Sequence, residues 1–312
     1  MYKKILVTGG NGLVGAALQV LAAEAPEKKF IFSSSKECDL TKYDEVIKYF
    51  ERHKPDAVIH LAAKAGGIGL SMKYPTTLLR DNVWMDFNVL EAARLNGVQK
   101  NIMTLSTGMY PADVKIPIKE EYIHDGYPHP SNYSYSFAKR LIEPSIKAYK
   151  TEYDMNVIGL IPNGIFGENM NYNYDDSTML AALIRRFYEN KDKDNDIVIW
   201  GDGSPLREYT YAKDIARIYL WCLERYNDEQ VLHIGTTQEQ SVKDVAFMIA
   251  EIMKVHKKRI TFDTSKPKGQ YRKGTDNSKF MNISKFSYTP FRIGLENTIN
   301  YFIENYPQNL RL

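Results

Sequence analysis

Cysteine is scarce in this sequence of 312 residues, which contains only Cys38 and Cys222. Two cysteines do not support a disulfide framework, and without a CxxC pair or a Cys/His cluster no metal site is predicted. Long hydrophobic runs are also missing, since no stretch reaches the ~18 apolar residues of a transmembrane helix. The first residues, MYKKILVTGG, lack the apolar stretch of a signal peptide. We therefore expect a cytoplasmic protein without a membrane span.

A large excess of one charge is lacking as well. The sequence has 41 basic and 38 acidic residues, which gives a formal net charge of +3. So small an excess does not indicate a nucleic-acid partner, although a local basic pocket is compatible with it. Internal repeats and low-complexity linkers are absent, and a chain of this length forms one large domain or two moderate ones.

The first half of the sequence alternates short apolar runs with segments of helical spacing. The runs are typical of buried strands and lie at Lys4–Thr8, Phe30–Ser33, Ala57–His60, Asn101–Leu105 and Val157–Ile161. The helical segments lie at Leu13–Glu24, Tyr43–His53, Thr77–Leu95 and Tyr135–Tyr153. This alternation predicts an α/β fold with a Rossmann-type doubly wound parallel sheet, covered by helices on both faces.

The alternation breaks down after Pro162. We expect residues 1–163 to form a dinucleotide-binding domain, with 208–230 packing on it. Residues 164–207 and 231–312 then form a smaller C-terminal α/β domain that binds the substrate, placed against the carboxyl edge of the sheet.

Glycines follow the first strand in the segment VTGGNGLVG, at Gly9, Gly12 and Gly15. Glycines there permit a tight turn and let backbone N–H groups approach a pyrophosphate, while the following helix, which opens with Leu13 and Val14, supplies partial positive charge. A glycine motif alone is weak evidence. Its position between a strand and a helix predicts a dinucleotide site.

The end of the second strand indicates which dinucleotide binds. Where NAD-preferring folds place an acidic residue, this chain has three serines, with Ser34 in the middle, and then Lys36. Hydroxyls and a cation suit a 2′-phosphate and offer no carboxylate to repel it, which predicts NADPH/NADP as the cofactor. A solvated surface lysine is the alternative for Lys36. Further cofactor contacts are expected at Asp39, Leu40, Ala62, Ala63, Lys64 and Pro162.

A possible catalytic pair is formed by Tyr135 and Lys139, which share one face of a predicted helix. A free tyrosine has a pKa near ~10, and a nearby ammonium group stabilises the phenolate. The same ammonium can hold the nicotinamide ribose. Ser106 and Thr107 close the fourth strand, where a hydroxyl can bond to a carbonyl oxygen. Tyr135 alone would more often be a packing residue, but the order of glycine loop, serine and tyrosine–lysine pair predicts catalysis.

The chain resembles the extended short-chain dehydrogenases and, more narrowly, the GDP-L-fucose synthase family of GDP-4-keto-6-deoxymannose epimerase/reductases. The likeness extends over nearly the whole sequence and is carried by VIHLAAKAGGI, LSTGMYP, HPSNYSYSFAKR, IPNGIFGEN, IWGDGSPLREYTYAKDIA and FDTSKPKGQYRK. It implies NADPH-dependent reduction at C4 of a GDP-linked 4-keto-6-deoxy sugar. In that reaction Tyr135 protonates the C4 oxygen, Lys139 holds the ribose and Ser106 orients the carbonyl.

The resemblance also implies substrate contacts, several of them basic. Arginine suits a diphosphate because its planar fork makes paired charge-assisted bonds. For the basic loop around Lys268 and Arg272, a solvated loop is about as expected as direct contact. The implied positions are Thr107, Gly108, Asn163, Thr178, Arg186, Trp200, Arg207, Lys268 and Arg272.

Two positions depart from the family pattern. The family epimerises C3 and C5 with a cysteine two residues beyond the strand-end serine and a histidine before the helix of the second domain. The first position is Gly108 here, and alignment places the second at Thr178. Glycine cannot move a proton, and a threonine hydroxyl is a poor general base. We expect a C4-reductase that has lost the epimerase activity, unless His124, His129 or Lys64 took over that role.

Other functions stay open at this stage. A bifunctional GDP-L-fucose synthase is the main alternative. A 4,6-dehydratase is disfavoured because Gly108-Met109 replace the acidic pair it needs, and a 4-epimerase with bound NAD because of the strand-end serines and Lys36. A non-catalytic dinucleotide sensor would have no use for an acid–base pair. The sugar can be a hexose or a heptose, and the family analogy implies a homodimer.

Overall fold

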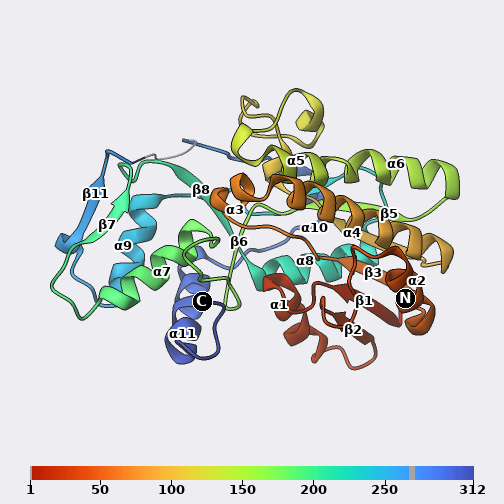
Figure 1. The fold of residues 1–312 in the computed structure, drawn as a ribbon, viewed down its shortest axis with the longest axis horizontal. Coiled ribbons are helices and arrows are strands. Elements are labelled where there is room, and N and C mark those ends of the chain that lie inside the picture. Colours follow the sequence, from red (N-terminus) through yellow and green to blue (C-terminus); the bar gives the residue numbers. More distant parts are fainter. Residues whose placement is uncertain (1, 267–270) are drawn as a thin grey trace.

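The computed structural model describes residues 2–266 and 271–312. Its larger half is built on a parallel sheet of six strands in the order β2-β1-β3-β4-β5-β9 (Figure 1). The strands are β1 (Lys4–Thr8), β2 (Lys29–Ser33), β3 (Ala57–His60), β4 (Lys100–Thr104), β5 (Val157–Ile161) and β9 (Leu232–His233). The predicted Rossmann-type sheet is therefore confirmed. The strand order reverses between β1 and β3, and such a switch point opens a crevice at the carboxyl ends of the strands.

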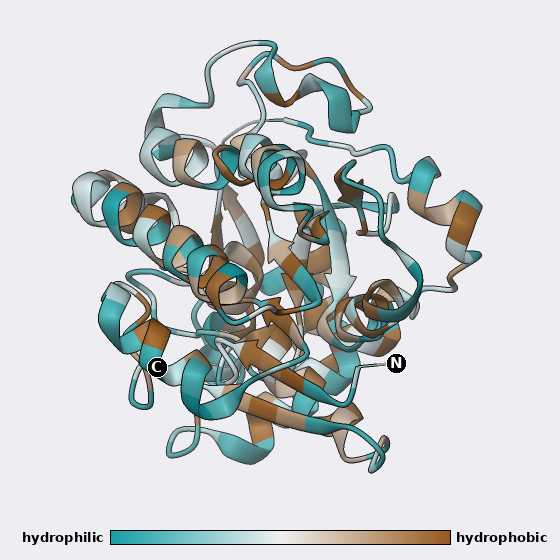
Figure 2. Cartoon of the chain, turned by 90° about the vertical axis from the view of Figure 1, so that its right-hand side faces the viewer, coloured by the Kyte–Doolittle hydropathy of each residue, from teal (hydrophilic) through white to brown (hydrophobic). Residues whose placement is uncertain are grey.

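Helices cover both faces of this sheet because its strands are apolar on both sides. Leu6 packs towards one face, where the core includes residues of α2, α4 and α6, whereas Ile5 and Val7 pack towards the other, with α1 and α8. Figure 2 shows the resulting brown layer of strands beneath helices that are teal on their outer sides. The helices are α1 (Leu13–Ala22), α2 (Tyr43–His53), α3 (Ile68–Lys73), α4 (Pro75–Leu95), α5 (Tyr133–Arg140), α6 (Ile142–Tyr153) and α8 (Ala212–Arg225).

The single helix expected at Tyr135–Tyr153 is divided into α5 and α6, with Leu141 between them. Pro144 lies in the first turn of α6 and has no N–H to offer the carbonyl of Arg140, so the helical ladder is interrupted there. The division leaves α5 as a short helix directed at the carboxyl edge of the sheet, and it carries both Tyr135 and Lys139.

The smaller half has two small sheets around an apolar core of its own (Figure 1, left). One sheet has the order β10-β8-β6, and the other pairs β11 with β7. The elements are β6 (Gly164–Phe166), β7 (Ile197–Trp200), β8 (Leu206–Tyr211), β10 (Glu239–Ser241), β11 (Ile260–Asp263), α7 (Met179–Asn190), α9 (Val242–Ile252), α10 (Ser278–Ser284) and α11 (Phe291–Asn305). Of these elements, helix α10 packs on the larger half.

Two segments expected in the smaller domain lie with the larger half. Strand β9 pairs with β5, because Leu232 and His233 are buried alongside Leu160 and Ile161. Phe280 of α10 is fully buried in the same core as α8. Residues 231–312 are therefore shared between the two halves. Within the described residues, no helix combines the length and apolar character needed to cross a bilayer.

Candidate active site

A tight loop of glycines joins β1 to α1 at the carboxyl edge of the large sheet. Gly9 has φ +68°, and a Cβ there would lie 2.8 Å from the backbone N of Ala62. A Cβ on Gly15 would lie 2.4 Å from the carbonyl oxygen of Gly9, so α1 can approach the loop only with glycine at this position. Gly12 starts α1 without a side-chain cap, which leaves backbone N–H groups of the first turn to bind an anion.

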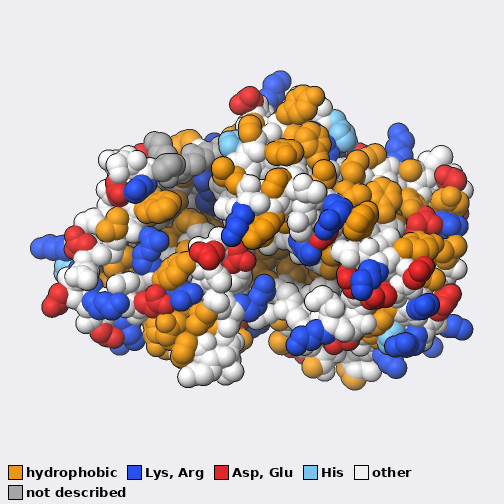
Figure 3. Space-filling model, in the orientation of Figure 1, with side chains coloured by type: hydrophobic (Ala, Val, Ile, Leu, Met, Phe, Trp, Pro, Cys, Tyr) orange, Lys and Arg blue, Asp and Glu red, His pale blue; other side chains and the backbone are white. Residues whose placement is uncertain are grey.

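Two cavities extend along this edge from β2 to β5. The first, of about 510 Å³, lies at the end of β2 and is called the β2 cavity; the second, of about 490 Å³, is called the Tyr135 cavity. Gly9, Gly12 and Arg311 line both of them. Figure 3 shows the surface hollowed between the two halves of the molecule. The cavities thus form a continuous groove over the glycine loop, which fits an extended dinucleotide.

The expected cofactor residues, with one exception, line this groove. Those at the β2 cavity are Gly9, Gly12, Ser34, Asp39, Leu40, Ala62, Ala63 and Lys64. Those at the Tyr135 cavity are Gly9, Gly12, Leu13, Val14, Gly15, Ala63, Pro162, Tyr135 and Lys139. Lys36 is the exception, because its exposed side chain lines neither cavity. The residues present therefore fit a dinucleotide, while the structure places Lys36 outside the groove.

A carboxylate lies at the end of β2 after all. Glu37 accepts a hydrogen bond of 2.8 Å from the backbone N of Ser34 and a second one from its hydroxyl group. These bonds lower the pKa of Glu37, so it is charged at neutral pH. The expectation that this strand end offers no carboxylate is therefore wrong. The sequence shows Glu37 four positions after Ser33, but it does not show that the Glu37 side chain folds back onto Ser34.

The expected catalytic side chains converge on the Tyr135 cavity, which is lined by Ser106, Tyr135 and Lys139. Hydrogen bonds between α5 and the segment after β4 hold them together. The Ser136 hydroxyl donates to the carbonyl of Gly108 at 2.7 Å, and the backbone N of Gly108 donates to the Ser106 hydroxyl at 3.1 Å. The polar face of α5 is thereby fixed against the strand-end serine.

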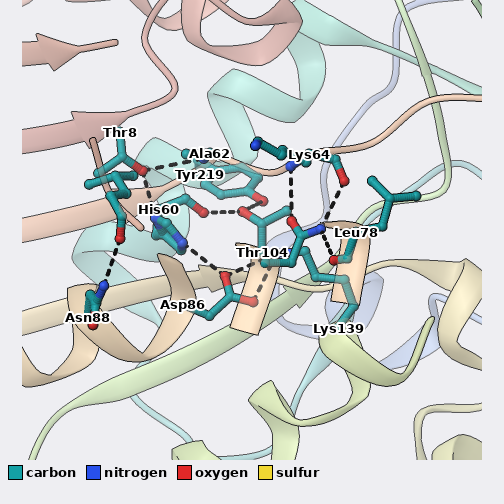
Figure 4. Close-up of polar contacts among 12 residues, drawn as sticks. Thr8, His60, Ala62, Lys64, Leu78, Asp86, Asn88, Thr104, Lys139 and Tyr219 are labelled. Carbon is teal, nitrogen blue, oxygen red and sulfur yellow. Dashed lines mark hydrogen bonds and ion pairs between the residues drawn. The ribbon is translucent and has the colours of Figure 1, made fainter. Parts of the chain in front are cut away.

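Lys139 is almost completely buried, with 1% of its side chain exposed, and its charge is balanced by Asp86 of α4. Its Nζ lies 3.2 Å from Asp86 Oδ1 (Figure 4). His60 Nε2 lies 2.9 Å from the same oxygen, and His60 Nδ1 lies 2.7 Å from the hydroxyl of Thr8. Burial lowers the pKa of His60, so the ring is neutral. We assign the ring proton to Nε2 because that nitrogen faces a carboxylate.

A second buried group lies beneath Tyr135. Tyr219 of α8 donates to the hydroxyl of Thr104 at 2.7 Å, and Thr104 donates to the carbonyl of His60 at 2.7 Å. Burial raises the pKa of Tyr219, so it remains protonated, and the proximity of Tyr135 contributes to that shift. The floor of the Tyr135 cavity is therefore built from groups whose hydrogen bonds are already made.

The expected substrate residues divide between two places. A small cavity of about 260 Å³, called the Thr178 cavity, adjoins the Tyr135 cavity through Thr107, Asn163 and Gly164, and it is also lined by Thr178 and Arg207. Gly108 follows Thr107, and a Cβ on it would meet Ser106 Oγ at 3.3 Å. A side chain at position 108 would therefore contact the strand-end serine Ser106.

Asn163 and Glu208 form the buried wall of the Thr178 cavity. The amide nitrogen of Asn163 donates to Glu208 at 2.9 Å and to the carbonyl of Thr236 at 2.7 Å, and its amide oxygen accepts from Thr210 at 2.6 Å. Glu208 also accepts two bonds from Thr275. Burial raises the pKa of Glu208. Because its polar atoms are engaged in this way, Asn163 shapes the cavity wall more than it binds a ligand.

Two cations face the same cavity. Arg207 lies on β8, and Lys273, which directly follows Arg272 in the sequence, lines the cavity beside it. Desolvation lowers the pKa of both groups, and the Arg207 charge lowers that of Lys273 further. Such mutual repulsion is relieved when an anion binds between them.

Arg186 and Trp200 line a separate cavity of about 660 Å³ between α7 and β7. Arg186 donates to the carbonyl of Val198 at 2.7 Å, and 60% of Trp200 is exposed. Arg272 forms an ion pair with Glu239 at 2.6 Å and lines none of these cavities. Lys268 lies outside the described residues. Arg186, Trp200 and Arg272 are thus not brought together with Arg207 in one cavity.

The groups considered as substitutes for the epimerase residues are engaged elsewhere. His124 pairs with Glu143 at 2.9 Å, and His129 bonds with Ser131 at 2.8 Å on the surface. Lys64 forms an ion pair with Asp81. None of the three lines the Thr178 cavity.

Arg311, the next-to-last residue of the sequence, was not predicted as a site residue because no motif surrounds it. The backbone carbonyl of Arg311 accepts from the backbone N of Tyr172 at 2.7 Å, and the neighbouring Leu310 and Leu312 pack on the core of the smaller half. No described residue makes a polar contact with its side chain, which lines both the β2 and the Tyr135 cavity. It is therefore a cation from the smaller half placed over the glycine loop.

Known proteins resemble this chain in both sequence and fold. Residues 5–235 match the NAD dependent epimerase/dehydratase family. A GDP-L-fucose synthase of Dictyostelium discoideum is 37% identical over 97% of this chain and 96% of its own. A GDP-L-fucose synthetase of Naegleria fowleri bound to NADP superposes with a TM-score of 0.92 and is 34% identical. The alignment covers 99% of this chain and 96% of that protein. A GDP-6-OMe-4-keto-L-xylo-heptose reductase of C. jejuni shares the fold, with a TM-score of 0.89 at 23% identity over 97% of this chain and 98% of its own.

Proposed function

The chain belongs to the NAD dependent epimerase/dehydratase family, among relatives of GDP-L-fucose synthase, and from this we propose that it reduces the C4 keto group of a GDP-linked 4-keto-6-deoxy sugar without epimerising C3 or C5. It is an oxidoreductase, and NADP(H) is its cofactor, as in the NADP-bound relative of N. fowleri. When bound, NADPH supplies the hydride that C4 receives.

The groove over the glycine loop would hold this cofactor. The backbone N–H groups at the start of α1 would bind its pyrophosphate, and Arg311 would add a positive charge from the smaller half. Ser34 and its neighbours line the end of the groove where an adenosine phosphate would lie. Glu37 must release the Ser34 hydroxyl before that hydroxyl can bond to a phosphate.

The chain's own residues supply the proton and the orientation. In this proposal Ser106 donates a hydrogen bond to the C4 oxygen, and Tyr135 transfers its phenolic proton to that oxygen as negative charge develops on it. Lys139 stabilises the phenolate left behind. Arg207 and Lys273 hold the diphosphate in the Thr178 cavity, because two cations there repel each other until an anion binds.

The reductase-only proposal is carried by the residues that line the Thr178 cavity. Epimerisation at C3 and C5 needs groups that remove and return protons on the ring, yet the two family positions are Gly108 and Thr178. The titratable groups among the described lining residues are Arg207, Glu208, Tyr209 and Lys273. Glu208 is fixed by Asn163 and Thr275, and the two cations are assigned to the diphosphate. Burial raises the pKa of Tyr209, so its phenol stays protonated and cannot act as a base.

The proposal is tested by proton exchange in D₂O. The protein is incubated with NADPH and GDP-4-keto-6-deoxymannose, and the sugar is analysed by mass spectrometry and NMR. We expect NADPH oxidation without deuterium at C3 or C5 beyond the background without enzyme. Deuterium above that background would instead support the bifunctional alternative. The double variant Gly108→Cys/Thr178→His serves as the positive arm and should gain exchange. If the protein binds NADPH but none of the keto-sugar nucleotides tested leads to NADPH oxidation, the non-catalytic dinucleotide sensor is supported instead.

We also propose a cytoplasmic homodimer. Leu79, Trp84 and Phe87 on α4 are each more than a third exposed, and so is Leu141 beside α5. Figure 3 shows orange side chains over the face where α4 and α6 run. Exposed apolar side chains of this kind commonly mark protein–protein contacts. Light scattering after gel filtration should give a molar mass twice that of one chain. The Trp84→Glu variant should give the mass of a single chain.

A further inference from the structure

The carboxylate of Asp86 is buried beside Lys139, in a position that no cofactor or substrate contact explains. Only 3% of its side chain is exposed. One of its oxygens, Oδ1, lies 3.2 Å from Lys139 Nζ and 2.9 Å from His60 Nε2 (Figure 4). Asp86 is on α4, His60 ends β3 and Lys139 is on α5, so this contact joins three elements around the site.

The hydrogen bonds can be assigned in only one direction along this chain of groups. The backbone N of Ala62 donates to Thr8 Oγ1 at 3.3 Å. Because the neutral His60 ring carries its proton on Nε2, its Nδ1 accepts from the Thr8 hydroxyl. His60 then donates from Nε2 to Asp86, and Lys139 donates to the same carboxylate. The first group, Ala62, lies against Gly9 in the glycine loop. This series of hydrogen bonds therefore connects the loop expected to hold the cofactor with the Lys139 ammonium group.

The physical need for this arrangement follows from burial. An ammonium group taken out of water strongly favours its neutral form unless a counter-ion compensates the lost hydration. Lys139 is 1% exposed, and Asp86 is the carboxylate that pairs with it among the described residues. A neutral amine at this position could not stabilise the Tyr135 phenolate.

We propose that Asp86 is a positioning residue that keeps Lys139 charged and directed at the site, and that His60, held by Thr8, fixes the orientation of the Asp86 carboxylate. This inference rests on the proposed function, because it assigns Asp86 a role through Lys139 and Tyr135. The other titratable groups facing the pair are His60 from β3, Tyr219 from α8, and Tyr135 on α5 itself.

The test compares Asp86→Asn with the wild-type protein. Two quantities are followed against pH. The first is the alkaline limb of kcat, measured with saturating NADPH and keto-sugar nucleotide. The second is the absorbance of the Tyr135 phenolate in the NADP⁺ complex, obtained by subtracting the titration of the matching Tyr135→Phe protein. In the wild type the two coincide. Without its counter-ion Lys139 loses its proton at lower pH, so the alkaline limb moves down by about one pH unit or more. The phenolate then forms without a neighbouring cation, and its midpoint moves up.

Controls separate this role from a structural one. Asp81→Asn removes another buried carboxylate of α4, one that pairs with Lys64 and Arg80, and should leave both quantities in place. Asp86→Glu keeps the charge and should restore the coincidence even where kcat is reduced. Asp86→Ser replaces Asn if the latter unfolds, and should separate the two curves in the same way.

The outcomes are distinguishable. The proposal is overturned if the alkaline limb of kcat and the midpoint of the Tyr135 phenolate titration still coincide in Asp86→Asn and Asp86→Ser. A lower melting temperature alone would then mark Asp86 as structural. The phenolate titration needs no sugar. If the wild type reduces no keto-sugar nucleotide, the proposed function fails, yet the shift of the midpoint still decides the role of Asp86.

Discussion

The two halves of the molecule prepare their polar groups in different ways. Around the Tyr135 cavity the groups are buried and already bonded: Lys139 is paired with Asp86, and Tyr219 with Thr104. In the smaller half, Arg207 and Lys273 face one cavity with no carboxylate paired to either among the described residues, and Trp200 is largely exposed. Under the proposed function, the larger half holds a preformed site for proton transfer, and the smaller half holds a recognition site that is completed by its anionic ligand.

The largest effect is expected from removing the proposed proton donor in the larger half. Tyr135→Phe should lower kcat by ~10²–10⁴-fold, the range of general acid catalysis, with little change in the Kd for NADPH. Steady-state kinetics and NADPH fluorescence measure the two quantities. Tyr133→Phe is the matched control, since that tyrosine lies on the same helix and is 48% exposed, and it should retain turnover. Equal losses in both variants would show that the helix, not the phenol, was disturbed.

In the smaller half the expected effect falls on KM. Arg207→Ala should raise the KM of the GDP-sugar by ~10–100-fold, because hydrogen bonds to charged groups contribute roughly 1.5–3 kcal/mol, and kcat should change less. Arg272→Ala is the comparison: Arg272 is paired with Glu239 and should shift KM by less than ~3-fold, as exposed ion pairs contribute little. If Arg272 has the larger effect, the assignment of the cavity to the diphosphate is wrong.

Arg311 tests whether the smaller half also contributes to cofactor binding. Arg311→Ala should raise the Kd for NADPH by ~3–10-fold, as expected for one partly exposed cation, and weaken its dependence on salt. Arg292→Ala should leave the Kd unchanged, because that side chain pairs with Glu251 and Glu296 on α9 and α11. Unaltered NADPH binding in Arg311→Ala would assign the whole cofactor site to the larger half.

The smallest effect is expected at the end of β2. Glu37→Gln should increase the preference for NADPH over NADH by ~2–5-fold, since it removes an exposed negative charge next to Ser34. The measurement is the Kd for NADH divided by the Kd for NADPH at neutral pH, where Glu37 is charged. If this ratio is lower in Glu37→Gln than in the wild type, Glu37 assists phosphate binding.

The sequence predicted the larger half well because topology decides its geometry. Parallel strands bring their carboxyl ends to one edge, so Gly9, Ser34, Ser106 and the face of α5 had to meet there. It could not predict Asp86 and His60, which are ordinary residues of a helix and a strand until the packing joins them to Lys139. In the smaller half Arg186 and Arg272 depend on loop geometry and on local partners, and no periodicity in the sequence encodes either.

Reduction at C4 without inversion at C3 and C5 is decided by the structure of the product. Wild-type protein, NADPH and GDP-4-keto-6-deoxymannose are reacted to completion, and the sugar is identified by NMR. We expect a GDP-6-deoxyhexose that keeps the configuration of the substrate at C3 and C5. GDP-L-fucose as the product would contradict the account, because its formation requires both centres to be inverted before the reduction.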